Sequence, residues 1–484
     1  MLKAHPAGPA RPLPERVLGL NSPVTYRLPY EDPRIIEPTK ALAPAWLRFP
    51  GGTVANYFDW RTGWLRVPAT ENPSIYRRFL LRAQEWVPKL HPGGITIERF
   101  TEIAQQVGAE IVFVPNLETS TVEEQTAWFK DMAAKGVVPR CLEMGNEFYI
   151  ALLDDPETRR IFPDLATTQK IMKTYLDAFR PYLPADVRVA AQVGASRLHH
   201  REEPKGADWN HRAWVWDDAQ EAEPWFDAVT AHMYPDLAAV AGPGALAGLP
   251  GNMDTVYPAL IARTDEGFDR CLSFISKKLP GKEIWVTEWG PLITGAVMLG
   301  QPVVWTGMWV QTVARGVLSL LRHPAVTVVN YHALFFDGGL MSLFRTAPDH
   351  GYVPVGGNRL LAWFHEAANR GALYHPLRLE GVLQREAKGT LLGEKFDEVA
   401  AALLEKKERF YLLVHNAVSE TRQVDLALLG LPAAPTLAEV METPDLAEDF
   451  SRATPPVRAL TPAQVLDLPP FSITRVIWEK RRPV

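Results

Sequence analysis

Eight short apolar runs, separated by longer amphipathic segments, constrain the fold of this chain more than any other feature. Between several of the runs, apolar side chains recur at helical spacing, as in residues 97–107, 121–134, 166–179 and 306–321. Short apolar runs that alternate with amphipathic helices are typical of parallel sheets. The eight predicted strands span residues 16–20, 45–49, 110–115, 138–144, 187–193, 226–232, 283–287 and 326–331.

The number of predicted strands favours a closed barrel over an open sheet. An open doubly wound sheet usually carries a glycine-rich phosphate loop after its first strand, whereas here Asn21, Ser22 and Pro23 follow it. We therefore expect residues 1–373 to form a (β/α)8 barrel of the α/β class. In such a barrel the chemistry lies at the carboxyl ends of the strands.

The pattern changes after residue 374. Short β-like runs at 382–385, 399–404, 410–414, 423–428, 438–442 and 474–479 are separated by turns, with no long amphipathic helix between them. This pattern of short strands and turns predicts an antiparallel β-sandwich domain over residues 374–484. We expect the sandwich to brace the barrel, and whether it also binds glycan stays open.

The bulk composition excludes several classes of partner. The formal net charge of −5, with no run of basic residues, argues against binding to nucleic acid. No apolar stretch reaches membrane-spanning length, and the N-terminus lacks the apolar core of a signal peptide. The two cysteines, Cys141 and Cys271, are expected to be buried, reduced thiols. Together these features predict a cytoplasmic protein without membrane contact, and they leave its oligomeric state unknown.

Two glutamates stand at the ends of predicted strands. Glu147 follows the fourth strand, directly after Asn146, and Glu288 ends the seventh strand, directly before Trp289. Both would therefore lie at one mouth of the barrel. Paired carboxyl groups there suit the cleavage of glycosidic bonds. A separation of about 5–5.5 Å would give retention of configuration, and about 6.5–9.5 Å would give inversion.

We assign the two glutamates different roles. Glu288 must be ionised to attack the anomeric carbon, and Glu147 must be protonated to donate to the departing oxygen. Once Glu288 is esterified, Glu147 can accept a proton from water. Asn146 is expected to hold a sugar hydroxyl beside them.

With these two glutamates, the chain resembles glycoside hydrolase clan A, whose members share an Asn-Glu acid/base at strand four and a Glu nucleophile at strand seven. The segment from Leu47 to Thr53, with Asn56-Tyr57 and Asp59-Trp60, resembles strand two of two families in that clan. These are the heparanase and β-glucuronidase family and the α-L-arabinofuranosidases. The likeness extends to residues 114–117 and 232–234, as scattered motifs over most of the first 370 residues.

The resemblance and the strand ends together suggest further substrate-binding residues. By the resemblance, Arg48 would lie near the nucleophile and keep it ionised. His232 and Tyr234, two residues apart, point to the same side of strand six, so Tyr234 could donate to Glu288. Other candidates for sugar contacts are Asn21, Asn116, His332 and, as a stacking platform, Trp289.

No cofactor is expected, and no metal, because His199, His200 and His211 lack the spacing of a ligand set. The expected function is a retaining glycoside hydrolase acting on β-glucuronides, α-L-arabinofuranosides or related plant or microbial glycans. Arg197, His199, Arg201 and Lys205 could pair with a substrate carboxylate, but we expect them to belong to a solvated loop. The alternatives are a transglycosylase and a non-catalytic carbohydrate-binding protein on the same barrel.

Overall fold

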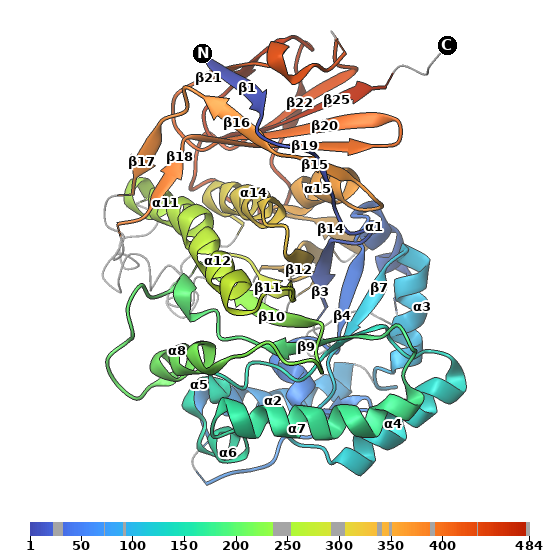
Figure 1. The fold of residues 1–484 in the computed structure, drawn as a ribbon. Helices are drawn as coiled ribbons and strands as arrows, with labels where there is room; N and C mark the ends of the chain where they lie inside the picture. The colour runs from blue at the N-terminus through green and yellow to red at the C-terminus, as the bar shows by residue number, and fades with distance from the viewer. Residues whose placement is uncertain are drawn as a thin grey trace.

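A computed structural model of the chain contains a closed barrel with a second body of β-sheet beside it (Figure 1). The structure describes residues 1–22, 32–71, 73–90, 93–235, 253–291, 305–335, 341–347, 351–387, 393–432 and 434–480. Eight parallel strands close the barrel, and antiparallel sheets follow in the C-terminal part of the chain. The predicted fold class, a (β/α)8 barrel with a β-sandwich, is confirmed.

The barrel strands follow one another around the barrel in chain order until the last strand pairs with the first. Each of the eight predicted runs overlaps one of them. In order they are β3 (Leu18–Asn21), β4 (Trp46–Phe49), β7 (Glu110–Phe113), β8 (Cys141–Glu143), β9 (Arg188–Gln192), β10 (Ala228–Met233), β11 (Glu283–Trp289) and β12 (Val326–His332).

Helices pack around the outside of the barrel (Figure 1). The four helices predicted from spacing are α3, α4, α7 and α14, and each end lies within one residue of its prediction. Helix α4 begins with the expected capping box between Thr121 and Glu124. The helices are α1 (Ile36–Ala41), α2 (Ile75–Leu90), α3 (Ile97–Val107), α4 (Val122–Lys135), α5 (Ala151–Asp154), α6 (Pro156–Ile161), α7 (Leu165–Phe179), α8 (Trp209–Ala219), α11 (Met253–Ala262), α12 (Phe268–Lys278), α14 (Gly307–Arg322) and α15 (Asn358–Ala368).

The interior of the barrel has an apolar layer and a polar layer. A cluster of buried apolar side chains, which includes Trp46, Cys141 and Trp285, fills the end where the strands begin. Two residues further along the same strands lie Arg48, Glu143 and Thr287, all buried. Alternate residues of a strand point to the same side, so the polar residues lie above the apolar layer. The polar layer therefore forms the floor of the barrel mouth.

The sandwich consists of a seven-stranded sheet, β2-β15-β19-β20-β25-β22-β23, and a four-stranded sheet, β16-β1-β21-β24. A separate apolar core, which includes Leu2, Leu412 and Trp478, unites them. The strands are β1 (Leu2–Pro6), β2 (Arg11–Pro12), β15 (Leu373–His375), β16 (Leu377–Glu380), β19 (Val399–Lys406), β20 (Arg409–Asn416), β21 (Arg422–Asp425), β22 (Leu437–Glu442), β23 (Val457–Ala459), β24 (Val465–Leu468) and β25 (Ser472–Glu479). Three two-stranded sheets complete the set: β5 (Phe58–Asp59) with β6 (Trp64–Leu65), β13 (Phe344–Ala347) with β14 (Gly351–Pro354), and β17 (Gln384–Glu386) with β18 (Lys395–Asp397).

The first strands of the chain belong to the sandwich and not to the barrel. Strand β1 pairs with β16 and β21, and β2 pairs with β15. The domain boundary at residues 373/374 stays a prediction, but the range 1–373 includes these two strands, whose hydrogen bonds join them to the C-terminal sheets. Local sequence patterns do not reveal a pairing across this many residues.

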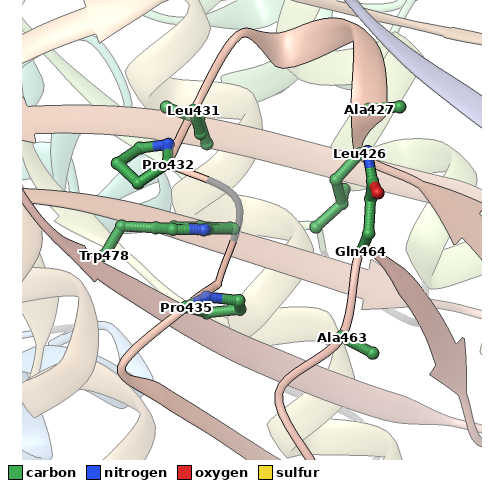
Figure 2. A pocket seen from close by; sticks show the side chains of 8 residues that line it. All are labelled: Leu426, Ala427, Leu431, Pro432, Pro435, Ala463, Gln464 and Trp478. Atoms are coloured by element: carbon green, nitrogen blue, oxygen red, sulfur yellow. The ribbon is translucent and has the colours of Figure 1, made fainter.

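A small pocket in the sandwich lies beside Trp478, which is flanked by Pro432 and Pro435 (Figure 2). Its volume is about 30 Å³, which admits water but no sugar ring. Trp478 is buried in the core between the sheets, so its ring offers no exposed platform. This pocket therefore gives no reason to assign glycan binding to the sandwich.

Both cysteines are buried and unpaired, as expected. Across the ranges given above, no helix is both long and apolar enough to cross a bilayer. The cytoplasmic location stays a prediction.

Candidate active site

Glu147 lies in the loop that follows β8. The backbone of Glu147 adopts a left-handed conformation with φ of +52°, which costs a non-glycine residue about 1–2 kcal/mol. This conformation directs the carboxyl group toward β10, where Nδ1 of His232 lies 2.7 Å from Oε1. The side chain of Glu147 is 20% exposed, so it is open to a ligand.

Glu288 lies on β11 and is nearly buried. Nη1 of Arg48 donates to its Oε1, and the hydroxyl of Tyr234 donates to its Oε2 at 2.6 Å. Nδ1 of His332 lies 3.8 Å from the same Oε2. The predicted contacts of Arg48 and Tyr234 with Glu288 are therefore present. Both oxygens of the carboxylate are held in place.

The two glutamates open into one site. A carboxylate oxygen of Glu147, one of Glu288 and a ring nitrogen of His232 all lie within 4.8 Å of one another. This spacing is on the short side of the two glycosidase geometries. The same three atoms are also of the kinds that bind metal ions, although Glu288 already uses both of its oxygens for hydrogen bonds.

The charges around Glu288 favour its ionised form. Burial alone would raise its pKa, but the positive charges of His232 and Arg48 outweigh burial and hold the pKa well below its usual range. Burial alone would lower the pKa of His232, but the carboxylates of Glu288 and Glu147 raise it to about 10. The site thus holds an ionised Glu288 next to an imidazolium.

A buried ion pair between Arg48 and Glu143 lies beneath Glu147, Glu288 and His232. Glu143 was not among the predicted site residues. Arg48 donates to both oxygens of Glu143, each at 2.7 Å, and Glu143 also accepts from the hydroxyl of Thr287 at 3.1 Å. Neither Arg48 nor Glu143 is exposed. One signal in the sequence could have revealed Glu143: it lies two residues after the apolar Cys141 on the same strand, so both face the barrel interior. Glu143 fixes the arginine that in turn contacts Glu288.

The side-chain oxygen of Asn146 is hydrogen-bonded within the protein, whereas its side-chain nitrogen is available to a ligand. Its Oδ1 accepts from Nη2 of Arg48 at 2.7 Å. Its buried Nδ2 has no hydrogen-bond partner within the described part of the chain. Because a buried donor without a partner is costly, this group is a natural contact for a ligand hydroxyl.

Three other predicted residues lie at the mouth or near it. Nδ2 of Asn21 donates to Nδ1 of His332 at 2.5 Å, so His332 is neutral there. Burial lowers the pKa of His332 to about 4. By contrast, all four hydrogen bonds of the Asn116 amide go to neighbouring protein groups, those of Phe58, Glu118 and Thr119. We therefore assign Asn116 a structural role in place of the expected sugar contact.

The expectation that Trp289 forms a sugar platform is wrong. The indole is only 2% exposed and packs edge-on against Tyr331 at 5.5 Å between centroids. It also covers Gly316 of α14 so closely that a β-carbon there would lie 2.3 Å from the ring. The side chain points outward from β11, to the helix layer, because its neighbour Glu288 points inward.

Of the four cations considered for a substrate carboxylate, Arg197 and Arg201 are paired with acidic residues. Arg197 is buried, stacks on Trp214 with its guanidinium carbon 3.4 Å from the ring centre, and donates to Asp218. Arg201 donates to Glu266 at 2.5 Å. His199 has a pKa lowered to about 3 by burial. Lys205 is exposed and has no ion-pair partner among the residues described.

Comparisons with known proteins find this architecture in glycoside hydrolases. A family 51 arabinofuranosidase from Xanthomonas axonopodis pv. citri matches with a TM-score of 0.69 at 15% identity, over 99% of both chains. A family 51 α-L-arabinofuranosidase from Bifidobacterium longum matches with a TM-score of 0.70 at 13% identity, over 99% of both chains. A 4-O-α-L-rhamnosyl-β-D-glucuronidase from Fusarium oxysporum 12S matches with a TM-score of 0.55 at 13% identity, over 98% of this chain and 99% of the other.

No known protein-family profile matches the sequence, and no curated protein matches it either. The likeness to the solved structures therefore concerns the fold. At that level the expected resemblance to clan A glycoside hydrolases is confirmed.

Proposed function

We propose that this protein is a retaining glycoside hydrolase that acts on neutral sugars, with α-L-arabinofuranosides as the first candidates. One observation carries the proposal: oxygens of Glu147 and Glu288 lie within 4.8 Å of each other at the mouth of a barrel. The fold shared with the arabinofuranosidases of Xanthomonas axonopodis pv. citri and Bifidobacterium longum supports the choice of substrate. The cytoplasmic location inferred from the sequence belongs to the same proposal.

In the first step, a carboxylate oxygen of Glu288 bonds to the anomeric carbon. The bond from that carbon to the leaving oxygen breaks, and Glu147 passes to this oxygen the proton that it shares with Nδ1 of His232, 2.7 Å away. Arg48 and Tyr234 hold the two oxygens of Glu288 and keep it aimed and ionised. The product is a glycosyl ester of Glu288.

In the second step, the ester has removed the negative charge of Glu288. Glu147, now a carboxylate, accepts a proton from a water molecule whose oxygen attacks the anomeric carbon. The ester bond breaks, and Glu288 regains its charge beside Arg48 and His232. Two inversions at one carbon give net retention.

The preference for a neutral sugar follows from the distribution of cations. A uronic acid needs a basic partner for its carboxylate. Of the cations considered for that role, Arg197 and Arg201 are paired with acidic residues. The sequence directly after β10 and β11 adds none, since residues 236–252 and 292–304 contain no Lys, Arg or His. This favours arabinofuranosides over glucuronides.

A screen of nitrophenyl glycosides tests the proposal, with α-L-arabinofuranoside, β-glucuronide, β-xyloside, β-glucoside and β-galactoside as substrates. We expect turnover of the arabinofuranoside, none of the glucuronide, and none by the Glu288→Ala variant. Binding of sugars without turnover of any glycoside would instead support the carbohydrate-binding alternative. Added alcohol or sugar acceptors separate hydrolysis from transglycosylation, because a transglycosylase would pass most of the glycosyl group to the acceptor.

A further inference from the structure

The backbone of residues 144–148 determines where Glu147 points. Two residues in this stretch, Gly145 and Glu147, have positive φ angles of 78° and 52°. The carboxyl group of Glu147 has a single hydrogen-bond partner among the described residues, His232. A strained loop keeps its shape only where its surroundings hold it. The position of the acid/base therefore depends on whatever fixes this backbone.

One side of the loop is held by Asn56, which lies in the short 3-10 helix η2 (Thr53–Tyr57) after β4. Nδ2 of Asn56 donates to the carbonyl of Asn146 at 2.8 Å, and the N–H of Asn146 donates back to Oδ1 at 3.1 Å. Asn56 is only 4% exposed. Both hydrogen bonds act on the residue directly before Glu147.

The other side is held by Gln192, the last residue of β9. Nε2 of Gln192 donates to the carbonyl of Met144 at 3.0 Å, and the N–H of Phe148 donates to Oε1 at 2.9 Å. Gln192 is 2% exposed. The phenyl ring of Phe148 stacks on Phe162 at 3.7 Å between centroids, which anchors the far end of the loop.

We propose that Asn56 and Gln192 are positioning residues that hold the acid/base Glu147 against His232 through the backbone of residues 144–148. The inference rests on the proposed function for the role of Glu147 as an acid. One buried amide comes from η2, after β4, and the other from the end of β9. Together they make four hydrogen bonds to the backbone on both sides of Glu147. Neither amide contacts the nucleophile Glu288, so a loss of either one affects proton transfer and leaves the attack on the anomeric carbon in place.

The variants Gln192→Met and Asn56→Leu remove the hydrogen bonds while keeping the volume and adding no charge. Asn369→Leu is the matched control, because Asn369 is an equally buried amide that binds the backbone of Val17 and Leu18 at the opposite end of the barrel. Each variant is assayed on two arabinofuranosides. From the dinitrophenyl glycoside, dinitrophenolate leaves without being protonated. From the phenyl glycoside, the leaving oxygen needs a proton from an acid.

For either positioning variant, kcat/KM on the phenyl glycoside should fall by about 10- to 100-fold. On the dinitrophenyl glycoside it should fall by less than about 3-fold, since that reaction bypasses the acid. The control variant Asn369→Leu should leave the ratio of kcat/KM on the phenyl glycoside to kcat/KM on the dinitrophenyl glycoside unchanged. Equal losses on both substrates in the Gln192→Met and Asn56→Leu variants would overturn the inference.

Crystal structures of the variants keep this test separate from the proposed function. If the wild-type protein cleaves neither glycoside, the proposed function fails, but the positions of Glu147 and His232 still decide the positioning role. We expect the 2.7 Å contact between them to be lost in Gln192→Met or in Asn56→Leu and kept in Asn369→Leu. Retention of this contact in both positioning variants would contradict the inference.

Discussion

A β-carbon added to Gly52 would lie 2.0 Å from Oε1 of Glu288. It would also lie 3.3 Å from Nη1 of Arg48. Glu288 cannot yield, because Arg48 and Tyr234 bind its two oxygens. The turn after β4 must therefore carry no side chain at this position, so that Glu288 and Arg48 can meet.

The variant Gly52→Ala should lose activity without losing its fold. The methyl group displaces Glu288 from its place beside Arg48, and a shift of about 1 Å at a reacting group costs about 100-fold in rate. Activity on the nitrophenyl arabinofuranoside and far-ultraviolet circular dichroism are the two measurements. Gly8→Ala is the control, since a β-carbon there meets nothing within 4 Å. A wild-type rate for Gly52→Ala would show that the close approach has no catalytic consequence.

The fold and the two central glutamates could be predicted because they depend on local patterns. Each barrel strand is an apolar run, and each predicted helix has regular spacing. Once the strands are ordered, Glu147 and Glu288 must end at the same mouth. Strand parity also predicts that His232 and Tyr234 face the same side.

The remaining features depend on contacts between distant residues. Nothing near Glu143 in the chain indicates that Arg48 is its partner, and nothing near Leu2 indicates that β1 pairs with β16. The prediction for Trp289 failed because aromatic residues beside a catalytic strand end suit both a sugar platform and a packed helix layer. The burial of its ring against α14 is decided by Gly316, which is distant in the sequence.

Breaking the buried ion pair between Arg48 and Glu143 should destabilise the protein. Arg48→Met leaves the carboxylate of Glu143 buried without its cation, which costs about 3–5 kcal/mol of unfolding free energy. Urea unfolding measures this loss. The double variant Arg48→Met with Glu143→Gln removes the unpaired charge and should recover part of it. A loss below about 1 kcal/mol for Arg48→Met would contradict this role.

Stability should depend on pH through His232. Although burial opposes the charged form, Glu288 and Glu147 raise the pKa of His232 to about 10, from about 6.5 in an unfolded chain. Because the folded pKa is raised, the stabilisation is fully present below about pH 6.5 and is lost as the pH rises through about 10. His232→Gln should therefore flatten the decline of Tm between pH 7 and 10.

Calorimetric scans at several pH values provide that measurement. His365→Gln is a matched control, because burial lowers the pKa of His365 to about 4 and leaves it neutral over this range. Its Tm should keep the wild-type slope. Parallel wild-type and His232→Gln curves would show that His232 carries no extra proton in the folded state.

Trp289 should matter for stability and not for substrate binding. Trp289→Phe removes part of a ring packed between Tyr331 and Gly316, which should cost about 1–3 kcal/mol. The KM for the aryl arabinofuranoside should stay within about 2-fold of the wild-type value, since uniform substrate binding is unaffected. A rise of about 10-fold or more in KM would restore Trp289 as a sugar contact.

The proposed nucleophile is tested most directly by trapping the glycosyl ester with a 2-fluoro arabinofuranosyl donor that carries a dinitrophenyl leaving group. Peptide mass spectrometry then locates the label. The fluorine slows hydrolysis of the ester, so the labelled protein accumulates. We expect one glycosyl group per chain, on the side chain of Glu288, and the same label in Glu147→Ala. A label on any other residue, or turnover with inverted configuration and no label, would contradict this expectation.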